Sequence, residues 1–462
     1  MKKKILATVL TTVIVVNVTV FADMNVIYNH KFTESVSAEL VWNDESIVKT
    51  FSPDASFTVK VDYETNKEKD CTVYITLDDN PEIKAGIIKM YPDKNKGEFT
   101  YKFKDLKYGV HNIKVRCEAD GVTIKEWTDT MPVMKLYERQ FMDWTTISGI
   151  NGHVVGSGNW DGEYAIELLE NAGILNVRDG IHWYAFEDET NKIYTVGDVD
   201  EVYELQFMKN VNSRDMSMLV NAHGIPTYKG KIANEGTQNH HAIIPGQVWL
   251  AQEYAEATTN AVKWNLSEYK DIEYFNEPNS AIMPSAVYVN HYMRTTVNLK
   301  KAGYQGGIEG FSVQANREKE WANEGFQSGI YPYMTAASIH PYGAGAKENS
   351  GDAYFDRSQF HYMYDNIIEF GGWKKIDCNE LGAPTTMMSE YGQVLTYIKD
   401  RIAVENYNAR GCYFYDLICD GTVATNKEHN FGIVNHKDNG WRPRPAYIAF
   451  VILSTSPEKI SP

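Results

Sequence analysis

The chain has 462 residues, of which 43% are hydrophobic and 23% are charged. This composition is that of a folded globular protein with a sizeable core, and it excludes a disordered chain. The formal net charge of −16 argues against nucleic acid and anionic membranes as partners, because both select a basic surface.

The N-terminus has the pattern of a secretory signal peptide. Three lysines at positions 2–4 precede an apolar run over 5–21, and Val20 and Ala22 are small residues at positions −3 and −1 of a cleavage site. We therefore predict a signal peptide over residues 1–22, a secreted or extracytoplasmic protein, and no stable membrane span after cleavage. A retained membrane anchor is the alternative, because the run is nearly long enough to span a bilayer.

Residues 23–135 are predicted to form a small β-sandwich, immunoglobulin-like in type. Segments such as FTVKVDYE, CTVYITLDD and HNIKVRCEA alternate apolar and polar residues and are separated by Asn, Gly, Pro and Asp. Turn signals every 8–12 residues or so, with no helical stretch, are typical of such sandwiches. Cys71 and Cys117 fall in two of these strands, and they are either a disulfide or two buried free thiols.

Residues 136–462 change to alternating short apolar strands and amphipathic helices. Eight strands are expected: WTTISGI, ILNVRDG, MSMLVNAH, IEYFNE, GGIEGFSV, AASIHPY, KIDCNEL and GCYFYDL. Eight strand–helix units predict a (β/α)8 TIM barrel. An open doubly wound sheet would also alternate, but no G-x-G-x-x-G loop follows an early strand.

Polar and aromatic residues gather where these strands end. Because active sites of such barrels lie at the carboxyl ends of the strands, these residues are the candidates for chemistry. In chain order they are Arg178, His182, Trp183, His223, Asn276, Glu277, His340, Tyr342, Glu380, Tyr415 and, further on, Trp441.

Two of these candidates are glutamates on strands four and seven, which lie roughly across the barrel from each other. Glu277 and Glu380 should therefore face each other over the central pocket. Two facing carboxylates about 5–5.5 Å apart suit a retaining glycoside hydrolase, in which one attacks the anomeric carbon and the other transfers the proton. Arg178 is expected to keep one carboxylate ionised, since a neighbouring cation lowers a carboxylate pKa.

These residues resemble clan A of the retaining glycoside hydrolases. The resemblance rests on Asn276-Glu277-Pro278 and Glu380, and the tail segments YFYDLICDGT, EHNFGIV and RPRPAYIAF look like glycoside hydrolase family 39 and the bacterial exopolysaccharide endoglycosidases near it. It implies that Glu277 is the acid/base and Glu380 the nucleophile. It also implies that Asn276 bonds the sugar 2-hydroxyl and that Tyr342 bonds the nucleophile. Many members carry a tryptophan where this chain has Tyr415.

Aromatic residues near the expected barrel mouth support a carbohydrate substrate, a polysaccharide or an oligosaccharide. Flat rings stack on the C–H faces of sugars and leave the hydroxyls to polar neighbours. The set is Trp144, Trp160, Trp183, Tyr184, Tyr228, Tyr333 and Trp441.

Two other functions fit the same barrel. A non-catalytic carbohydrate-binding protein is one, although such proteins usually lose a catalytic carboxylate. A metal-dependent hydrolase is the other, because His153, His182, His223, His240, His241 and His340 are numerous. Neither H-x-H nor H-E-x-x-H spacing occurs, so we expect no metal and no cofactor. We also expect a monomer.

Overall fold

The fold is described from a computed structural model of the chain. It describes residues 34–43, 50–134, 148–153, 162–182, 203–223, 253, 255–260, 262, 271–279, 283–314, 319–343 and 356–455. The chain forms two compact units, the first from most of the chain up to Met131 and the second from Pro132 onwards together with the short segments Ser46–Thr50 and Tyr108–Val110. The signal peptide expected over 1–22 lies outside the described residues. Among the helices described, none is both long enough and apolar enough to cross a membrane.

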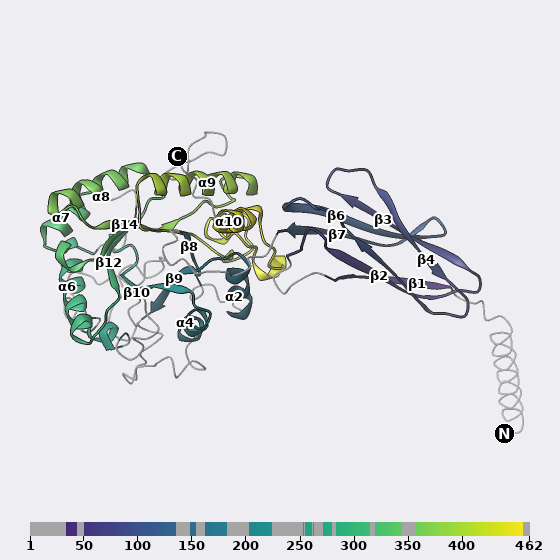
Figure 1. Ribbon diagram of the computed structural model, residues 1–462, viewed down its shortest axis with the longest axis horizontal. Helices are drawn as coiled ribbons and strands as arrows, with labels where there is room; N and C mark the ends of the chain where they lie inside the picture. Colours follow the sequence, from purple (N-terminus) through teal and green to yellow (C-terminus); the bar gives the residue numbers. More distant parts are fainter. Residues whose placement is uncertain are drawn as a thin grey trace, which may run out of the picture. The chain divides into compact units, whose positions relative to one another are not determined.

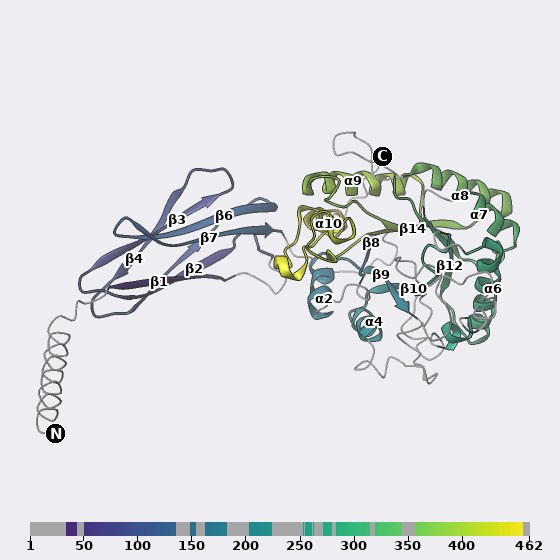
Figure 2. The same ribbon diagram turned by 180° about the vertical axis from the view of Figure 1, so that it is seen from behind.

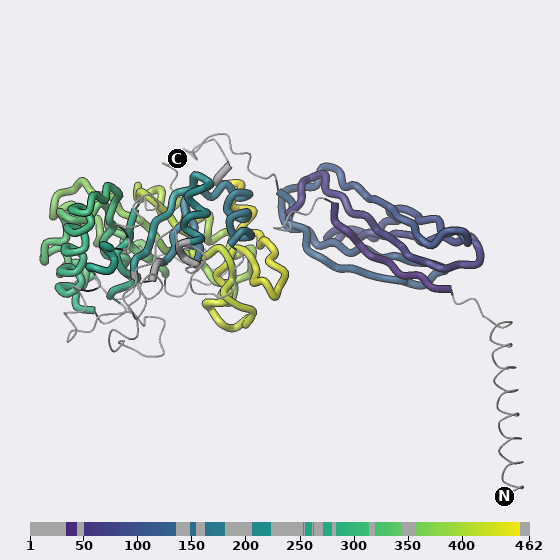
Figure 3. The backbone as a smooth tube through the Cα atoms, turned by 90° about the horizontal axis from the view of Figure 1, so that it is seen from below, coloured from purple at the N-terminus to yellow at the C-terminus, as the bar shows by residue number. Residues whose placement is uncertain are grey.

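The first unit consists of two antiparallel sheets. One has the order β1 (Ser35–Trp42), β2 (Ser56–Glu64) and β5 (Lys96–Lys102), and the other has the order β4 (Ile83–Met90), β3 (Lys69–Leu77), β6 (Gly109–Ala119) and β7 (Val122–Val133). Figure 1 and Figure 3 show these long strands as a unit without helices. Alternate residues of β2 and β3 are buried, as in strands that cover one side of a core.

Cys71 on β3 and Cys117 on β6 are free, buried thiols that lie side by side in this sandwich. Cys71 pairs in register with Ala119, and Cys117 pairs with Val73, so the two thiols are diagonal neighbours on one face of the sheet. Of the two alternatives that the sequence left open, the structure therefore has the free thiols.

The second unit contains a closed barrel of eight parallel strands. In barrel order they are β8 (Ser148–Asn151), β9 (Asn176–His182), β10 (Ser217–His223), β11 (Asp271–Tyr274), β12 (Gly307–Gln314), β13 (Ala336–His340), β14 (Lys375–Leu381) and β15 (Gly411–Phe414). Each pairs in parallel with its neighbours. The TIM-barrel fold and the all-β first unit predicted from the sequence are confirmed.

Helices surround these strands, as Figure 1 and, from behind, Figure 2 show. They are α2 (Gly162–Asn171), α4 (Tyr203–Ser213), α6 (Ser285–Lys301), α7 (Lys319–Gln327), α8 (Arg357–Phe370), α9 (Glu390–Asn406) and α10 (Pro445–Thr455). Ser389 caps the N-terminus of α9, where its hydroxyl accepts from the Gly392 amide, and Asp356 caps α8, where its carboxylate accepts from the Ser358 amide.

The fourth barrel strand ends earlier than its apolar pattern predicts. The pattern IEYFNE extends to Glu277, whereas β11 ends at Tyr274. Phe275 and Glu277 have φ values of 70° and 45°, in the left-handed region that strands do not use. The chain therefore leaves the sheet before Glu277, and this glutamate lies on the turn beyond the strand end.

A glycine directly after β14 brings two loops at the carboxyl end of the barrel into contact. A Cβ built on Gly382 would collide with the backbone carbonyl of Tyr415. Because this atom belongs to the backbone and not to a flexible side chain, it cannot move aside without shifting the chain. We expect Gly382→Ala to destabilise the protein by about 1–3 kcal/mol, the usual cost of overpacking. Its melting temperature should fall. Gly162→Ala in α2 is the matched control, because a Cβ there meets open space, and it should leave Tm unchanged or slightly raised.

Candidate active site

Glu277 and Glu380 face each other at the carboxyl end of the barrel. An oxygen of each carboxylate and a ring nitrogen of His340 all lie within 4.8 Å of one another. His340 Nδ1 lies 3.0 Å from Glu277 Oε1 and 3.3 Å from Glu380 Oε2. Glu380 is the penultimate residue of β14, and His340 is the last residue of β13. Three strand ends that are far apart in the sequence thus supply two carboxylates and an imidazole to one point.

Arg178 on β9 holds the polar residues of this site in place. Its Nη1 donates to Glu380 Oε1 at 2.8 Å and to Asn151 Oδ1 at 2.6 Å, and its Nη2 donates to Asn276 Oδ1 at 2.8 Å. Its Nε and Nη2 also donate to the two oxygens of Glu273, at 2.5 and 2.8 Å. A planar guanidinium with five N–H groups is suited to bridging two buried carboxylates at fixed angles.

The surroundings of Glu380 favour its ionised form. Burial raises the pKa of this carboxyl, but the charges of His340 and Arg178 and the hydrogen bond from Arg178 outweigh burial, and the net shift is downward. The hydroxyl of Tyr342 also donates to Glu380 Oε2, at 3.2 Å. A lowered carboxyl pKa means that Glu380 stabilises the fold above its ordinary pKa of 4.5 and that this contribution is lost as the pH falls through the lowered value.

The backbone at Glu277 is fixed by its neighbours. Its amide donates to the carbonyl of Ser312 at 3.1 Å, and Pro278 restricts the conformation of the residue before it. The left-handed φ of 45° at Glu277 is costly for a residue with a Cβ. Backbone of this kind is retained mainly at functional sites, where the surroundings hold it. The backbone around Glu277 therefore fixes the direction of its carboxylate.

The imidazole of His340 is fully buried between the two glutamates. Burial lowers the pKa of His340, but the charge of Glu380 and the hydrogen bond and charge of Glu277 outweigh burial, and the pKa is raised above 6.5. The imidazolium form therefore stabilises the fold. This contribution is fully present below about pH 6.5 and is lost as the pH rises through the raised pKa.

Replacing His340 tests whether its contribution to stability decreases as the pH rises. We expect His340→Gln to lower the free energy of unfolding by about 1–3 kcal/mol near pH 6, the usual contribution of a buried hydrogen bond to a charged group. The difference from wild type should shrink as the pH rises towards 9. Urea unfolding at several pH values measures it. His361→Gln is the control, because His361 is exposed on α8 and its loss should cost less than about 0.5 kcal/mol. A difference that grows with pH would contradict this account of His340.

An aromatic group borders the nucleophile candidate. The rings of Tyr342 and Tyr415 both meet the buried ring of Phe431 edge-on, with centroids 6.0 and 5.1 Å away. Tyr415 is half-buried, and its hydroxyl lies 3.3 Å from His153 Nδ1. Tyr415 is therefore the aromatic side chain at the end of strand eight, where the family pattern often has tryptophan.

The remaining predicted site residues are placed as follows. His182 and His223 are the last residues of β9 and β10 and pair in register with each other, so both backbones reach the carboxyl end of the barrel. Their side chains, and all of Trp183, lie outside what the structure describes. Trp441 stacks on Tyr164 of α2, with ring centroids 4.3 Å apart, and this contact does not bring it to the glutamate pair.

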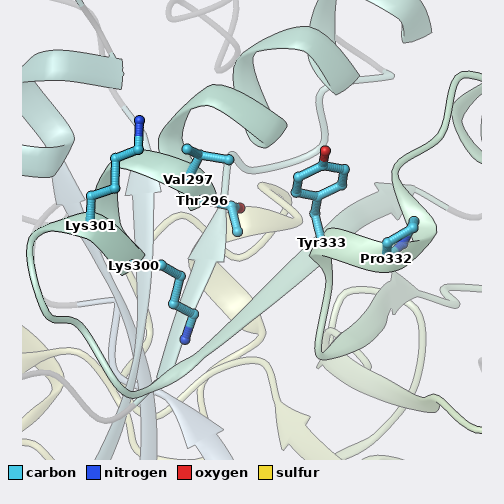
Figure 4. Close-up of a pocket in the computed structure, with 6 residues that line it drawn as sticks. All are labelled: Thr296, Val297, Lys300, Lys301, Pro332 and Tyr333. Atoms are coloured by element: carbon cyan, nitrogen blue, oxygen red, sulfur yellow. The ribbon is translucent and has the colours of Figure 1, made fainter.

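Tyr333 does not lie at the barrel mouth, and that expectation was wrong. It ends the short 3-10 helix η4 (Tyr331–Tyr333), which comes before β13, so it lies near the amino end of that strand. Figure 4 shows it across a groove from helix α6. The groove has a volume of about 510 Å³ and is lined by Thr296, Val297, Lys300, Lys301, Pro332 and Tyr333. None of these side chains is a carboxylate. Of the other expected aromatic residues, Trp144, Trp160, Tyr184 and Tyr228 lie outside the described residues.

Sequence reasoning missed the buried residues behind Arg178. Glu273 on β11 is fully buried and accepts hydrogen bonds from Arg178, from Asn221 Nδ2 at 2.8 Å, and from the hydroxyl of Ser312. Ser312 reaches it because β12 is irregular between Gly310 and Val313. The segment DIEYFNE could have indicated this residue, because Glu273 lies inside the predicted strand. A carboxylate buried in a barrel strand requires a cationic partner.

No family model matches the chain, and no curated protein matches it. Among solved structures it is similar to a family 39 glycoside hydrolase from Bacteroides cellulosilyticus, with a TM-score of 0.67 and 16% identity over 90% of this chain and 82% of that one. The chain is also similar to an exo-β-1,4-mannosidase of an Opitutaceae bacterium, with a TM-score of 0.48 and 15% identity over 66% of this chain and 58% of that one. The first likeness shows a shared fold.

Proposed function

We propose that this chain is a retaining glycoside hydrolase that cleaves β-glycosidic bonds of a polysaccharide or oligosaccharide by double displacement. The observation that carries the proposal is the separation of at most 4.8 Å between an oxygen of Glu277 and an oxygen of Glu380. Retaining enzymes have carboxyl groups about 5–5.5 Å apart, whereas inverting enzymes need about 6.5–9.5 Å to admit a water molecule. The fold shared with a family 39 enzyme supports the same reaction class.

Glu380 is proposed as the nucleophile. Two donors, Arg178 and Tyr342, hold its charge without transferring a proton to it, because a guanidinium and a phenol are both much weaker acids than a carboxylic acid. The charged carboxylate attacks the anomeric carbon and forms a glycosyl–enzyme ester, and the glycosidic oxygen leaves from the opposite face.

Glu277 is proposed as the acid/base. It delivers a proton to the departing oxygen in the first step and takes a proton from the attacking water in the second. His340 lies within 3.3 Å of both glutamates and so can balance the charge that moves between them. Asn276, held by Arg178, is proposed to bond the sugar 2-hydroxyl next to the reacting carbon.

The flanking residues are proposed to bind the sugar. Tyr342 donates to Glu380, and Tyr415 packs on the same Phe431 ring as Tyr342. His182, Trp183, His223 and Trp441 are retained as substrate-binding candidates from the sequence. We further propose that the protein is exported after loss of residues 1–22, that residues 23–135 and 136–462 are its two domains, and that it acts as a monomer.

The proposal is tested by incubating the mature protein with a panel of β-linked polysaccharides and following the products by ¹H NMR. The first-formed reducing end should be the β-anomer, because two displacements restore the starting configuration. A first-formed α-anomer would refute the retaining mechanism. Binding without any product across the panel would favour the non-catalytic carbohydrate-binding alternative.

A further inference from the structure

A second cluster of side chains lies at the ends of the first and last barrel strands, apart from the two glutamates. His153 comes two residues after β8, and Asp416 and Asp420 come after β15. His153 Nδ1 lies 3.0 Å from Asp420 Oδ1 and 3.5 Å from Asp416 Oδ2, and one ligand atom from each of the three residues lies within 4.8 Å of the others. The side chains are 35%, 0% and 15% exposed for His153, Asp416 and Asp420.

Asp416 is the member of this cluster whose carboxylate is not satisfied by hydrogen bonds from the described part of the chain. Its side chain is fully buried, and neither carboxylate oxygen has a hydrogen-bond partner among the described residues. A buried carboxylate without a partner carries a large desolvation cost. A proton on His153 Nδ1 is directed at one acceptor, Asp420 at 3.0 Å, and Asp416 at 3.5 Å is left beyond good hydrogen-bond distance.

We propose that His153, Asp416 and Asp420 form a binding site for a divalent transition-metal ion, with zinc the best fit. Two ligands about 2.0–2.1 Å from a tetrahedral zinc ion lie about 3.3 Å apart. The separations of 3.0 and 3.5 Å bracket this value. An ion contacts all three residues at once, which a single proton cannot do, and its two positive charges match the two carboxylates.

The mixed donor set selects among cations. One imidazole nitrogen with two carboxylates suits zinc or manganese. Calcium prefers six to eight oxygen ligands or so, and magnesium keeps most of its waters, so neither matches a site with a nitrogen donor. Three protein ligands leave one tetrahedral position open for water. Because the ligands come from both sides of the β15–β8 junction, the ion would tie these two strand ends together next to Tyr415.

The same chemistry does not extend to Glu277, His340 and Glu380, although their spacing is similar. Arg178 donates to Glu380 at 2.8 Å, and a second cation there would be repelled by that guanidinium. No lysine or arginine in the described part of the chain pairs with Asp416. The two clusters therefore differ, because Glu380 has a guanidinium partner whereas Asp416 has only His153 among the described residues.

The test uses the mature, untagged protein, freed of metal with a chelator and titrated with Zn²⁺ at about pH 7.5, where zinc binding should release the proton from His153. Calorimetry and elemental analysis should show one zinc per chain. The melting temperature should rise as zinc increases, because an ion that binds the folded state stabilises it. Asp420→Asn and His153→Asn should each weaken zinc binding by more than about tenfold. Both residues are partly exposed, so both variants should fold, which circular dichroism checks.

His361→Ala is the matched histidine control and should bind zinc as wild type does. Absence of zinc binding by the folded wild type overturns the proposal, as does unchanged binding in both cluster variants. Zinc binding that is lost in Glu380→Ala and kept in Asp420→Asn also overturns it, because the ion would then sit between the glutamates. These outcomes do not depend on the proposed glycosidase activity, since each is read from binding and stability.

Discussion

Replacing Glu380 by alanine should lower kcat/KM by about 10⁴-fold or more, because its carboxylate is the group proposed to form the covalent intermediate. The fold should survive the change. Arg178 keeps its two hydrogen bonds to Glu273, so the buried guanidinium is still paired with a carboxylate. Initial rates on the best polysaccharide from the screen, with circular dichroism as the folding check, measure the effect.

Azide gives this variant a sharper readout than loss of rate. The truncated side chain leaves room for a small anion, and azide attacks once from the face that Glu380 occupied. The product on a substrate with an activated leaving group should be a glycosyl azide of inverted configuration. Glu369→Ala, on the exposed side of α8, is the control and should keep wild-type activity without azide. Full activity in Glu380→Ala would remove it from the nucleophile role.

Replacing Glu277 by glutamine should have the second largest effect, about 10²–10⁴-fold on natural glycans, where the leaving oxygen needs a proton. The loss should be much smaller for aryl glycosides whose leaving groups depart without protonation. Glutamine keeps the size of the side chain and can still hydrogen-bond to His340, so the left-handed backbone at this residue should be undisturbed. Parallel kinetics on the polysaccharide and on an activated aryl glycoside measure the difference.

Azide also separates the two glutamates in this second variant. In Glu277→Gln the nucleophile is intact, so azide intercepts the glycosyl–enzyme intermediate and gives a glycosyl azide of retained configuration. Opposite configurations from the two variants therefore assign the two roles independently. Equal losses on both substrate types, or an inverted azide product, would count against Glu277 as the acid/base.

The barrel could be predicted from the sequence because each strand is a short apolar run and segments with the apolar spacing of amphipathic helices separate the strands. All eight predicted strands are present, and His340 ends its strand as expected, whereas β9 continues four residues beyond Arg178 to His182. Where local backbone departs from the pattern, prediction failed. The apolar run predicts a strand to Glu277, but positive φ values at Phe275 and Glu277 end β11 at Tyr274. No apolar pattern encodes that turn.

Contacts between distant loops were also beyond the sequence. Asp420 is 267 residues from its hydrogen-bond partner His153, and no motif spacing links the two. Histidine motifs such as H-x-H detect ligands that share one strand, whereas this cluster is assembled only when β8 and β15 close the barrel. The prediction that Tyr333 lies at the barrel mouth failed for a related reason. Its aromatic character fitted a sugar-binding ring, but its position before β13 places it at the other end of that strand.

The central claim is that Glu380 becomes covalently linked to the sugar while Glu277 transfers the proton. The most direct measurement is mass spectrometry of the protein after reaction with an activated 2-deoxy-2-fluoro glycoside of the sugar that the screen identifies. The fluorine slows both steps and the good leaving group restores the first, so the intermediate accumulates. We expect one sugar per chain, carried by the peptide that contains Glu380. An unlabelled protein that still turns over the parent substrate, or a label on another residue, would contradict the assignment.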